Sequence, residues 1–286
     1  MGVGVAAGFR DVPLIRSDRC GWTSLLSCDV VLGDGGRRLL DLADGWTGRW
    51  WARWKTAGAD VHIPVRDLAA SVPAGTRPVR SFTWSTRQRH RPGLAYLVST
   101  RRHHGFESIA EQRVLLALDF AGELVDVLPQ PFCLRFTTRG MGPAEHTPDF
   151  LAVSRQGVDL IDVRPAGRVR DEDLVKFAAA AEAALACGWR YVLVTGWKPN
   201  TVTTIDTLSS QRRPLRDVLG VQAALLEEAA AGGARTLAAL VARTALPAVA
   251  RAHLLHLLWH RRLGVDLARP LTDSSAVWPA GGGQES

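Results

Sequence analysis

Lysine is scarce in this chain of 286 residues: the only lysines are Lys55, Lys176 and Lys198, so arginine carries almost all of the basic charge. Basic residues still outnumber acidic ones, and the formal net charge is +7 at pH 7. A genome rich in G and C would explain why arginine replaces lysine, but not the excess of base over acid. The charge favours a polyanionic partner, nucleic acid ahead of a membrane surface.

Cysteine pairs, apolar runs and several catalytic motifs are also lacking. The four cysteines include no CxxC pair, which argues against a zinc ribbon or a disulfide framework and fits a reducing cytoplasm. There is no signal-peptide pattern at the start and no apolar stretch of membrane-spanning length. The sequence contains no GxxxxGK loop, no GxSxG elbow and no HExxH helix. We expect a cytoplasmic protein without a membrane partner.

The chain is long enough for two or three domains. We expect an N-terminal region of unknown fold over residues 1–75, a basic arm over 76–105, an α/β core over 106–212, a helical domain over 213–280 and a disordered tail over 281–286. In the first region, a short strand is predicted over Cys28–Leu32. The spacing of Trp46, Trp50 and Trp54 predicts one face of a helix. Packing is the preferred role of these tryptophans, and base stacking is the alternative.

The basic arm belongs to a stretch, residues 68–106, that contains no aspartate or glutamate. Arginines recur through it, and three of them would lie on one side of an extended chain, where side chains alternate. We interpret the stretch as a DNA-contacting segment that tracks phosphates, with a solvated basic loop as the alternative. The candidate DNA-binding residues are Arg87, Arg89, Arg91, Arg101 and Arg102.

Residues 106–212 alternate between helical and strand patterns. The predicted order is helix, three strands, helix, strand, over Glu107–Phe120, Phe132–Phe136, Asp149–Val153, Val158–Val163, Asp171–Cys187 and Tyr191–Thr195. We expect Gly140–Pro143 to be a loop. This order predicts a mixed α/β core, neither a doubly wound fold nor a barrel.

The last third of the chain is rich in alanine and leucine. Predicted helices over Leu215–Ala231, Thr236–Thr244 and Pro247–Arg262 precede two short strands, Leu263–Leu267 and Ser275–Trp278. Helix, turn, helix and a small β-ribbon is the outline of a winged helix. Three histidines of the last helix are expected to contact DNA or a partner: His253, His256 and His260.

The two central strands carry the chemistry. If they pair about the turn at residues 154–157, Leu151 faces Leu160 and Asp149 faces Asp162, with the two carboxylates about 5 Å apart at Cβ. Facing like charges destabilise a hairpin unless a cation compensates, and hard oxygen ligands suit Mg²⁺ or Mn²⁺. The preceding helix adds two acids on one face, Glu107 and Glu111, either of which could complete the metal site.

Four fragments in order now carry a family resemblance: Glu107-Ser108-x-x-Glu111, Gln130-Pro131-Phe132, Thr147-Pro148-Asp149-Phe150 and Ile161-Asp162-Val163-Arg164-Pro165. Over about residues 100–210, the chain resembles the TnsA-type endonuclease subunit of heteromeric transposases. The resemblance implies a restriction-endonuclease-like PD-(D/E)XK fold, a mixed sheet flanked by helices, with a C-terminal winged-helix-like domain. It implies that Glu111 (with Glu107 as auxiliary), Asp149 and Asp162 hold the magnesium ion and that Arg164 completes the motif.

This chain departs from the family at the last two positions. Asp162 stands where the family has Gln or Glu, and Arg164 stands where it has Lys. Arginine is not a conservative replacement at a site that needs a compact point charge, and its pKa is too high for a general base. Slow cleavage, a substitute amine from Lys176 and an inactive site all remain open.

The resemblance also implies a reaction and partners. The reaction would be hydrolysis of the 5′ strands at the ends of a DNA transposon, in double-stranded DNA at the nucleoid. The partners would be a DDE-type integrase subunit and an AAA+ ATPase regulator, with the C-terminal domain docking the latter. Two alternatives remain: a non-catalytic winged-helix DNA-binding regulator, and a PD-(D/E)XK nuclease of repair or restriction.

Overall fold

A computed structural model describes residues 13–27, 34–55, 59–71, 92–121, 123–232 and 235–281. The chain is a mixed α/β protein with several small sheets. Its contacts divide it into a central unit, Leu26–Trp197, and a C-terminal unit, in which Lys198–Ser286 joins Met1–Leu25. The sequence-based boundaries lie elsewhere, at residues 75, 105 and 212. In the part of the chain that is described, no helix is long and apolar enough to cross a membrane.

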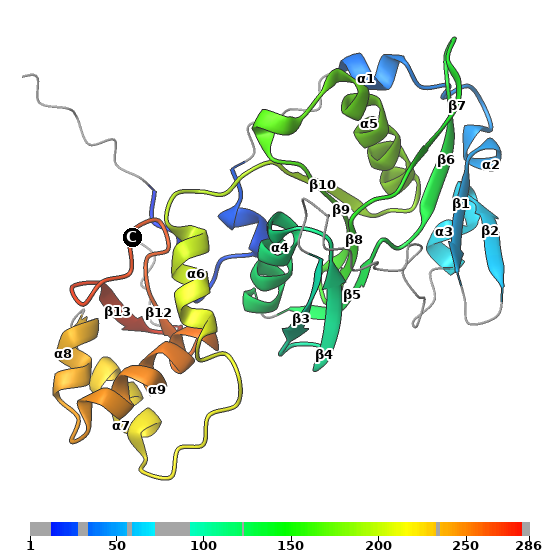
Figure 1. Cartoon of the computed structure of the whole chain (residues 1–286). Helices are drawn as coiled ribbons and strands as arrows, with labels where there is room; N and C mark the ends of the chain where they lie inside the picture. Colours follow the sequence, from blue (N-terminus) through cyan, green and yellow to red (C-terminus); the bar gives the residue numbers. More distant parts are fainter. Residues whose placement is uncertain are drawn as a thin grey trace, which may run out of the picture. The chain divides into compact units, whose positions relative to one another are not determined.

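The main sheet of the central unit has the strand order β10-β9-β8-β5. Three antiparallel strands, β5 (Leu124–Pro129), β8 (Phe150–Ser154) and β9 (Gly157–Val163), are followed by β10 (Arg190–Val194), which runs parallel to β9. A parallel neighbour needs a crossover, and helix α5 (Asp171–Ala186) supplies it and packs against β9 and β10 (Figure 1). Helix α4 (Ile109–Phe120) precedes the sheet and contacts β9.

The strong sequence patterns are confirmed. Both predicted helices and all four predicted strands form, with ends shifted by up to two residues. The predicted register also holds, because Leu151 pairs with Leu160 and Val153 with Val158. Two strands were not predicted: β5, and β7 (Gly142–His146), which begins inside the segment expected to be a loop.

A second sheet, with the order β2-β1-β6-β7, lies in the same unit. It joins β1 (Trp51–Lys55) and β2 (Asp60–Pro64) to the hairpin of β6 (Cys133–Thr138) and β7. Three short helices complete the unit's N-terminal part: α1 (Asp34–Arg38), α2 (Trp46–Arg49) and α3 (Val65–Ser71). Because β6 and β7 belong to this sheet, the chain leaves the main sheet after β5 and returns to it at β8.

The predicted tryptophan helix is wrong. Helix α2 ends at Arg49, and the chain becomes extended at Trp50 before entering β1. Pairing of β1 with β6 and β2 overrides the helical spacing, and strand alternation exposes Trp51. The preferred packing role is confirmed for Trp50 and Trp54, which are buried in the core. The strand predicted over Cys28–Leu32 lies outside the described residues.

The C-terminal unit contains α6 (Thr201–Ser209), α7 (Val221–Ala230), α8 (Leu237–Ala242), α9 (Pro247–Trp259) and a three-stranded sheet of order β11-β13-β12, whose first strand lies between α7 and α8 in the chain. Its strands are Arg235–Thr236, Ala276–Pro279 and Leu263–Gly264. Helix α7 starts six residues later than predicted, because the carboxylate of Asp217 accepts the N–H groups of Val221 and Gln222 at its first turn. A short segment, η1 (Trp22–Leu25), belongs to the same unit.

The three histidines of α9 make internal contacts. His253 lies 3.1 Å from the side-chain amide of Gln222, and His256 and His260 lie 2.8 and 3.1 Å from the carbonyls of Gln211 and Arg212. His253 and His256 are buried. The expected contact of these two with DNA or a partner is therefore replaced by a structural role, holding the segment between α6 and α7 onto α9.

Candidate functional site

Asp149 and Asp162 stand side by side on the β8–β9 hairpin. Asp149 directly precedes β8 and Asp162 lies near the end of β9, so both acids lie at the end of the hairpin away from its turn. The strand pairing ends at Phe150 and Ile161, and the N–H of Asp149 donates to the carbonyl of Ile161 at 3.0 Å, one residue out of that register. The Asp149 carboxylate accepts the N–H of Val163 at 2.7 Å.

The acids interact strongly. Burial raises the pKa of Asp149 well above its usual range, and the negative charges of Asp162, Glu111 and Glu107 raise it further. Asp162, Glu111 and Glu107 therefore lie within electrostatic reach of Asp149. Keeping them together costs stability unless a proton or a cation compensates.

Asp162 is buried and held by two residues that the sequence analysis missed. His146 Nε2 lies 3.0 Å from both carboxylate oxygens, and the Tyr191 hydroxyl donates to one of them at 2.7 Å. Burial, followed by the charge of Asp162, raises the pKa of Tyr191 well above its usual range. The His146 ring meets the ring of Phe177 edge-on, with centroids 6.0 Å apart. His146 escaped notice because β7, which presents it, was not predicted.

Glu111 has a structural task as well. Ser108 is the N-cap of α4, and its hydroxyl accepts the N–H of Glu111 while donating to the Glu111 carboxylate at 2.8 Å. The same carboxylate accepts the N–H of Glu107 at 2.8 Å. Ser108 and Glu111 therefore form an N-terminal cap related to a capping box, in which the Glu111 carboxylate accepts the N–H of Glu107 and not that of the N-cap residue; the sequence analysis overlooked this cap. A metal-binding role for Glu111 therefore competes with its cap.

Arg164 lies two residues after Asp162 in the chain, but its side chain contacts the carboxylate of Asp173. Its guanidinium forms an ion pair with Asp173 of α5 at 3.1 Å and donates to the carbonyl of Arg168 at 3.1 Å. Asp173 also accepts the N–H of Arg170 at the start of α5. Lys176 lies one turn further along this helix, and no hydrogen bond or ion pair among the described residues joins it to the acids.

The donor set fits a hard divalent cation only in part. Among the residues that the structure describes, no three histidine, cysteine, aspartate or glutamate side chains are arranged to hold a metal ion. Two adjacent carboxylates are the oxygen donors that Mg²⁺ and Mn²⁺ prefer. A further oxygen, Oε1 of Gln130, is buried without a hydrogen-bond partner, and the N–H of Gln130 donates to the carbonyl of Asp149 at 2.8 Å. With that amide oxygen, the residues present fit the ion.

Neither protein-family models nor curated proteins match this chain.

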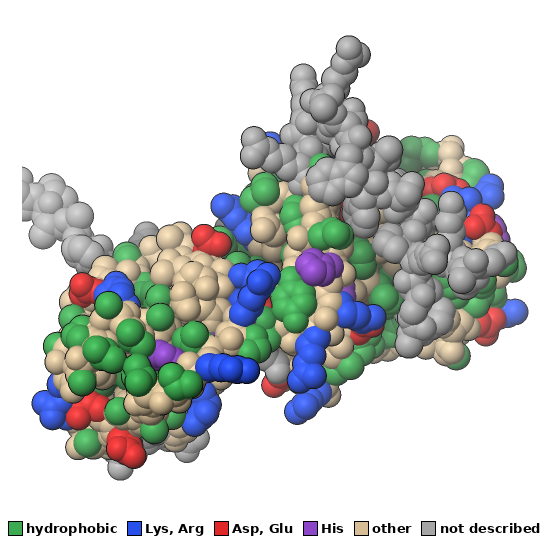
Figure 2. All heavy atoms as spheres, turned by 60° about the horizontal axis from the view of Figure 1, so that its bottom comes forward, with side chains coloured by type: hydrophobic (Ala, Val, Ile, Leu, Met, Phe, Trp, Pro, Cys, Tyr) green, Lys and Arg blue, Asp and Glu red, His purple; other side chains and the backbone are tan. Residues whose placement is uncertain are grey.

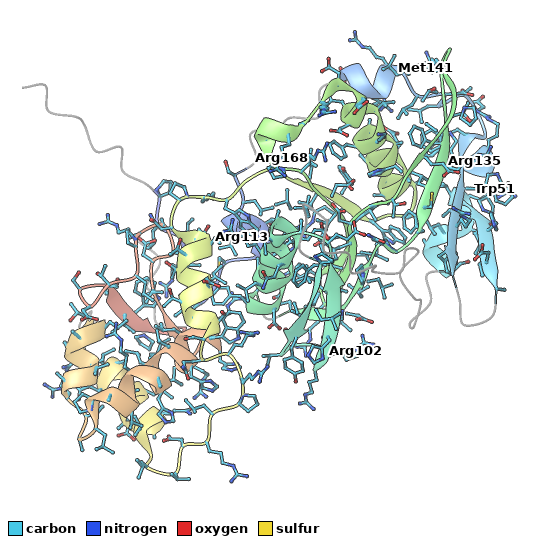
Figure 3. The ribbon with its side chains drawn as sticks, in the orientation of Figure 1. Trp51, Arg102, Arg113, Arg135, Met141 and Arg168 are labelled. Atoms are coloured by element: carbon cyan, nitrogen blue, oxygen red, sulfur yellow. The ribbon has the colours of Figure 1, made fainter. Side chains whose placement is uncertain are left out.

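Part of the predicted DNA-binding arm is described. Strands β3 (Gly93–Leu97) and β4 (Arg102–Phe106) form a hairpin that packs on α4, and Arg101 sits in its turn with a left-handed φ of 55°. Arg102 is labelled at the end of this hairpin in Figure 3, and it forms an ion pair with Asp126. Lys and Arg side chains are prominent on this part of the central unit in Figure 2. Arg87, Arg89 and Arg91 lie outside the described residues.

Proposed function

We propose that this chain is a metal-dependent DNA endonuclease with a PD-(D/E)XK core. The observation that carries the proposal is the adjacency of Asp149 and Asp162 on neighbouring antiparallel strands, beside the acids of α4. The order of elements supports it: a helix, three antiparallel strands, a crossover helix and a strand parallel to the third. This topology is the one expected for a restriction-endonuclease-like fold from the family resemblance, with β6 and β7 inserted between its first two strands.

In the proposed reaction, Asp149 and Asp162 would hold a divalent cation, and Glu111 would join them only by leaving its cap. When bound, the cation would supply charge neutralisation at the phosphate and activation of water. His146 and Tyr191 fix the carboxylate of Asp162, as outer groups commonly do at metal sites. Arg164 stays protonated and can neutralise phosphate charge, but it cannot accept a proton from water. To reach the phosphate, it must give up its ion pair with Asp173.

We further propose that the enzyme is the TnsA-like subunit that cuts the 5′ strands at transposon ends, in the cytoplasm and at the nucleoid. A DDE-type integrase and an AAA+ ATPase would be its partners, as the resemblance implies. The C-terminal unit supports a winged-helix-like domain, because α7, β11, α8, α9, β12 and β13 follow one another in that order and the strands form one sheet.

The test is a nicking assay on supercoiled DNA that carries the ends of the element, with partner subunits and Mg²⁺ or Mn²⁺. Asp149→Ala and Asp162→Ala should each abolish nicking, because each removes a charged ligand. Glu172→Gln, which removes an exposed acid from the first turn of α5, is the matched control and should cut like wild type. Equal cleavage by Asp149→Ala and wild type would overturn the proposal.

One group of observations favours a second candidate, a non-catalytic DNA-binding regulator. Glu111 is committed to its cap, Asp162 to His146 and Arg164 to Asp173, so these three predicted catalytic side chains each have a structural partner. This candidate predicts DNA binding without metal-dependent cleavage under any condition. A nuclease of repair or restriction would instead cut without the element's ends or its partners.

A further inference from the structure

Gln130 has a left-handed backbone conformation and lies next to Asp149 in the main sheet. It follows β5 directly and adopts a left-handed φ of 46°, which is uncommon for a residue with a side chain of this length. In the register that pairs Leu128 with Leu151 and Pro129 with Phe150, it falls opposite Asp149. The hydrogen bond from its N–H to the carbonyl of Asp149 fixes that position at 2.8 Å.

The side chain of Gln130 is buried, and its oxygen is unsatisfied. Only 5% of the residue is exposed, and Oε1 has no hydrogen-bond partner. Leaving a buried acceptor unpaired costs about 1–3 kcal/mol. A left-handed glutamine adds backbone strain of a similar order. A simple turn from β5 towards β6 needs neither feature, because glycine would make it at lower cost.

The acids alone leave the candidate metal site incomplete. No three acidic, histidine or cysteine side chains within the described ranges are arranged to hold an ion, and Glu111 is engaged in its N-terminal cap. An amide carbonyl is a hard oxygen donor of the kind that Mg²⁺ and Ca²⁺ accept in proteins. The backbone of Gln130 lies next to Asp149, which itself lies next to Asp162. Across the sheet, three oxygen-bearing residues thus stand in one row.

We propose that Gln130 supplies the third protein oxygen to the divalent cation held by Asp149 and Asp162. This inference rests on the proposed function, since it deepens the same site. It gives the Gln130-Pro131 fragment a chemical role, and it explains why a buried amide oxygen is kept without a partner.

The test compares two variants in full-length protein, with Mn²⁺ alone as the probe. Gln130→Met keeps the length and volume of the side chain but removes the oxygen, whereas Asp149→Ala removes an acidic ligand. Binding is measured by calorimetric titration, and the melting temperature is measured with and without Mn²⁺. We expect Gln130→Met to weaken Mn²⁺ binding by about 10- to 100-fold, the range for loss of a supporting group at a metal site.

The metal-free melting temperature separates a ligand from a packing residue. Without Mn²⁺, Gln130→Met should melt at or above the wild-type temperature, because an unsatisfied buried oxygen has been removed. Gln130→Glu keeps an oxygen at the position where Gln130→Met has none, so it should bind Mn²⁺ more tightly than Gln130→Met. Asp149→Ala should abolish it.

The experiment distinguishes failure of the proposed role of Gln130 from failure of the proposed metal site. If Asp149→Ala abolishes binding while Gln130→Met binds as wild type does, the role of Gln130 is overturned and the proposed function stands. The same holds if Gln130→Met lowers the metal-free melting temperature and leaves affinity unchanged. If the wild-type chain binds no Mn²⁺, the metal site and the inference both fail.

Discussion

The β8–β9 hairpin and the C-terminal unit both bury polar side chains, but in opposite ways. At the hairpin, the half-buried Asp149 lies near the buried Asp162, and the charge of Asp162 raises the pKa of Asp149. In the C-terminal unit, His253 and His256 are buried against the neutral groups of Gln222 and Gln211. Buried polar groups that satisfy one another are explained by folding. Buried groups that oppose one another need another explanation, and in this chain such groups gather where the resemblance puts the catalytic site.

The largest expected effect is on cleavage and concerns Arg164. Arg164→Ala should lower metal-dependent nicking by about two orders of magnitude, because it removes a positive charge from the phosphate. Arg164→Lys should retain or raise the rate, since it restores a compact point charge. The assay uses the element's ends with partner subunits present.

Asp173→Asn is the companion variant for that prediction. It weakens the ion pair that holds Arg164 towards α5, so it should leave nicking unchanged or increase it. If Arg164→Ala cuts as fast as wild type, Arg164 is not part of the site, and Lys176 becomes the next residue to test.

The next prediction concerns folding stability and tests whether a buried histidine of the C-terminal unit has a structural role. His256→Phe keeps an aromatic ring in α9 but leaves the carbonyl of Gln211 without its 2.8 Å partner. We expect unfolding free energy to fall by about 1–3 kcal/mol, measured by urea denaturation, while Mn²⁺ binding stays unchanged. An equally stable variant would show that the buried histidine is not structural.

Removing a polar group from the β8–β9 hairpin should stabilise the protein, whereas removing His256 from α9 should destabilise it. Asp149→Asn removes a negative charge near Asp162, so in the absence of metal it should raise the melting temperature by about 2–4 °C. The pKa of Asp149 is raised in the folded chain, so folding favours its protonated form, and this contribution is lost as pH rises through the raised pKa. The gain from Asp149→Asn should therefore be largest at neutral pH and vanish near the usual pKa of 3.8. A lower melting temperature of Asp149→Asn than of wild type at neutral pH, without metal, would contradict this prediction.

The smallest expected effect tests a buried histidine of the central unit. Burial lowers the pKa of His104 below its ordinary value of 6.5, and its ring nitrogens lie 2.9 Å from the Val127 carbonyl and 2.7 Å from the Thr100 hydroxyl. A lowered pKa means that stability is full above pH 6.5 and is lost as pH falls through the folded-state pKa. His104→Gln should flatten this decline in thermal melts recorded as the pH is lowered below 6.5. An unchanged slope would mean that His104 titrates normally.

The sequence by itself determined the central hairpin and most of the C-terminal unit. Local periodicity fixed α4, α5 and α9, and the turn at residues 154–157 fixed the pairing of β8 with β9, which brings Asp149 near Asp162. These features depend on neighbours that are close in the chain, so alternation and helical spacing are enough to predict them.

Tertiary structure decided the rest. Strand pairing, not helical spacing, set the conformation of Trp50 and Trp54, because the partner strand β6 lies some 80 residues away in sequence. The neighbours of the acids also come from distant segments: His146 from β7 and Tyr191 from β10 both reach Asp162. No spacing rule reports a contact between segments so far apart in the chain. The sequence placed two carboxylates near each other, and only the fold decided which side chains surround them.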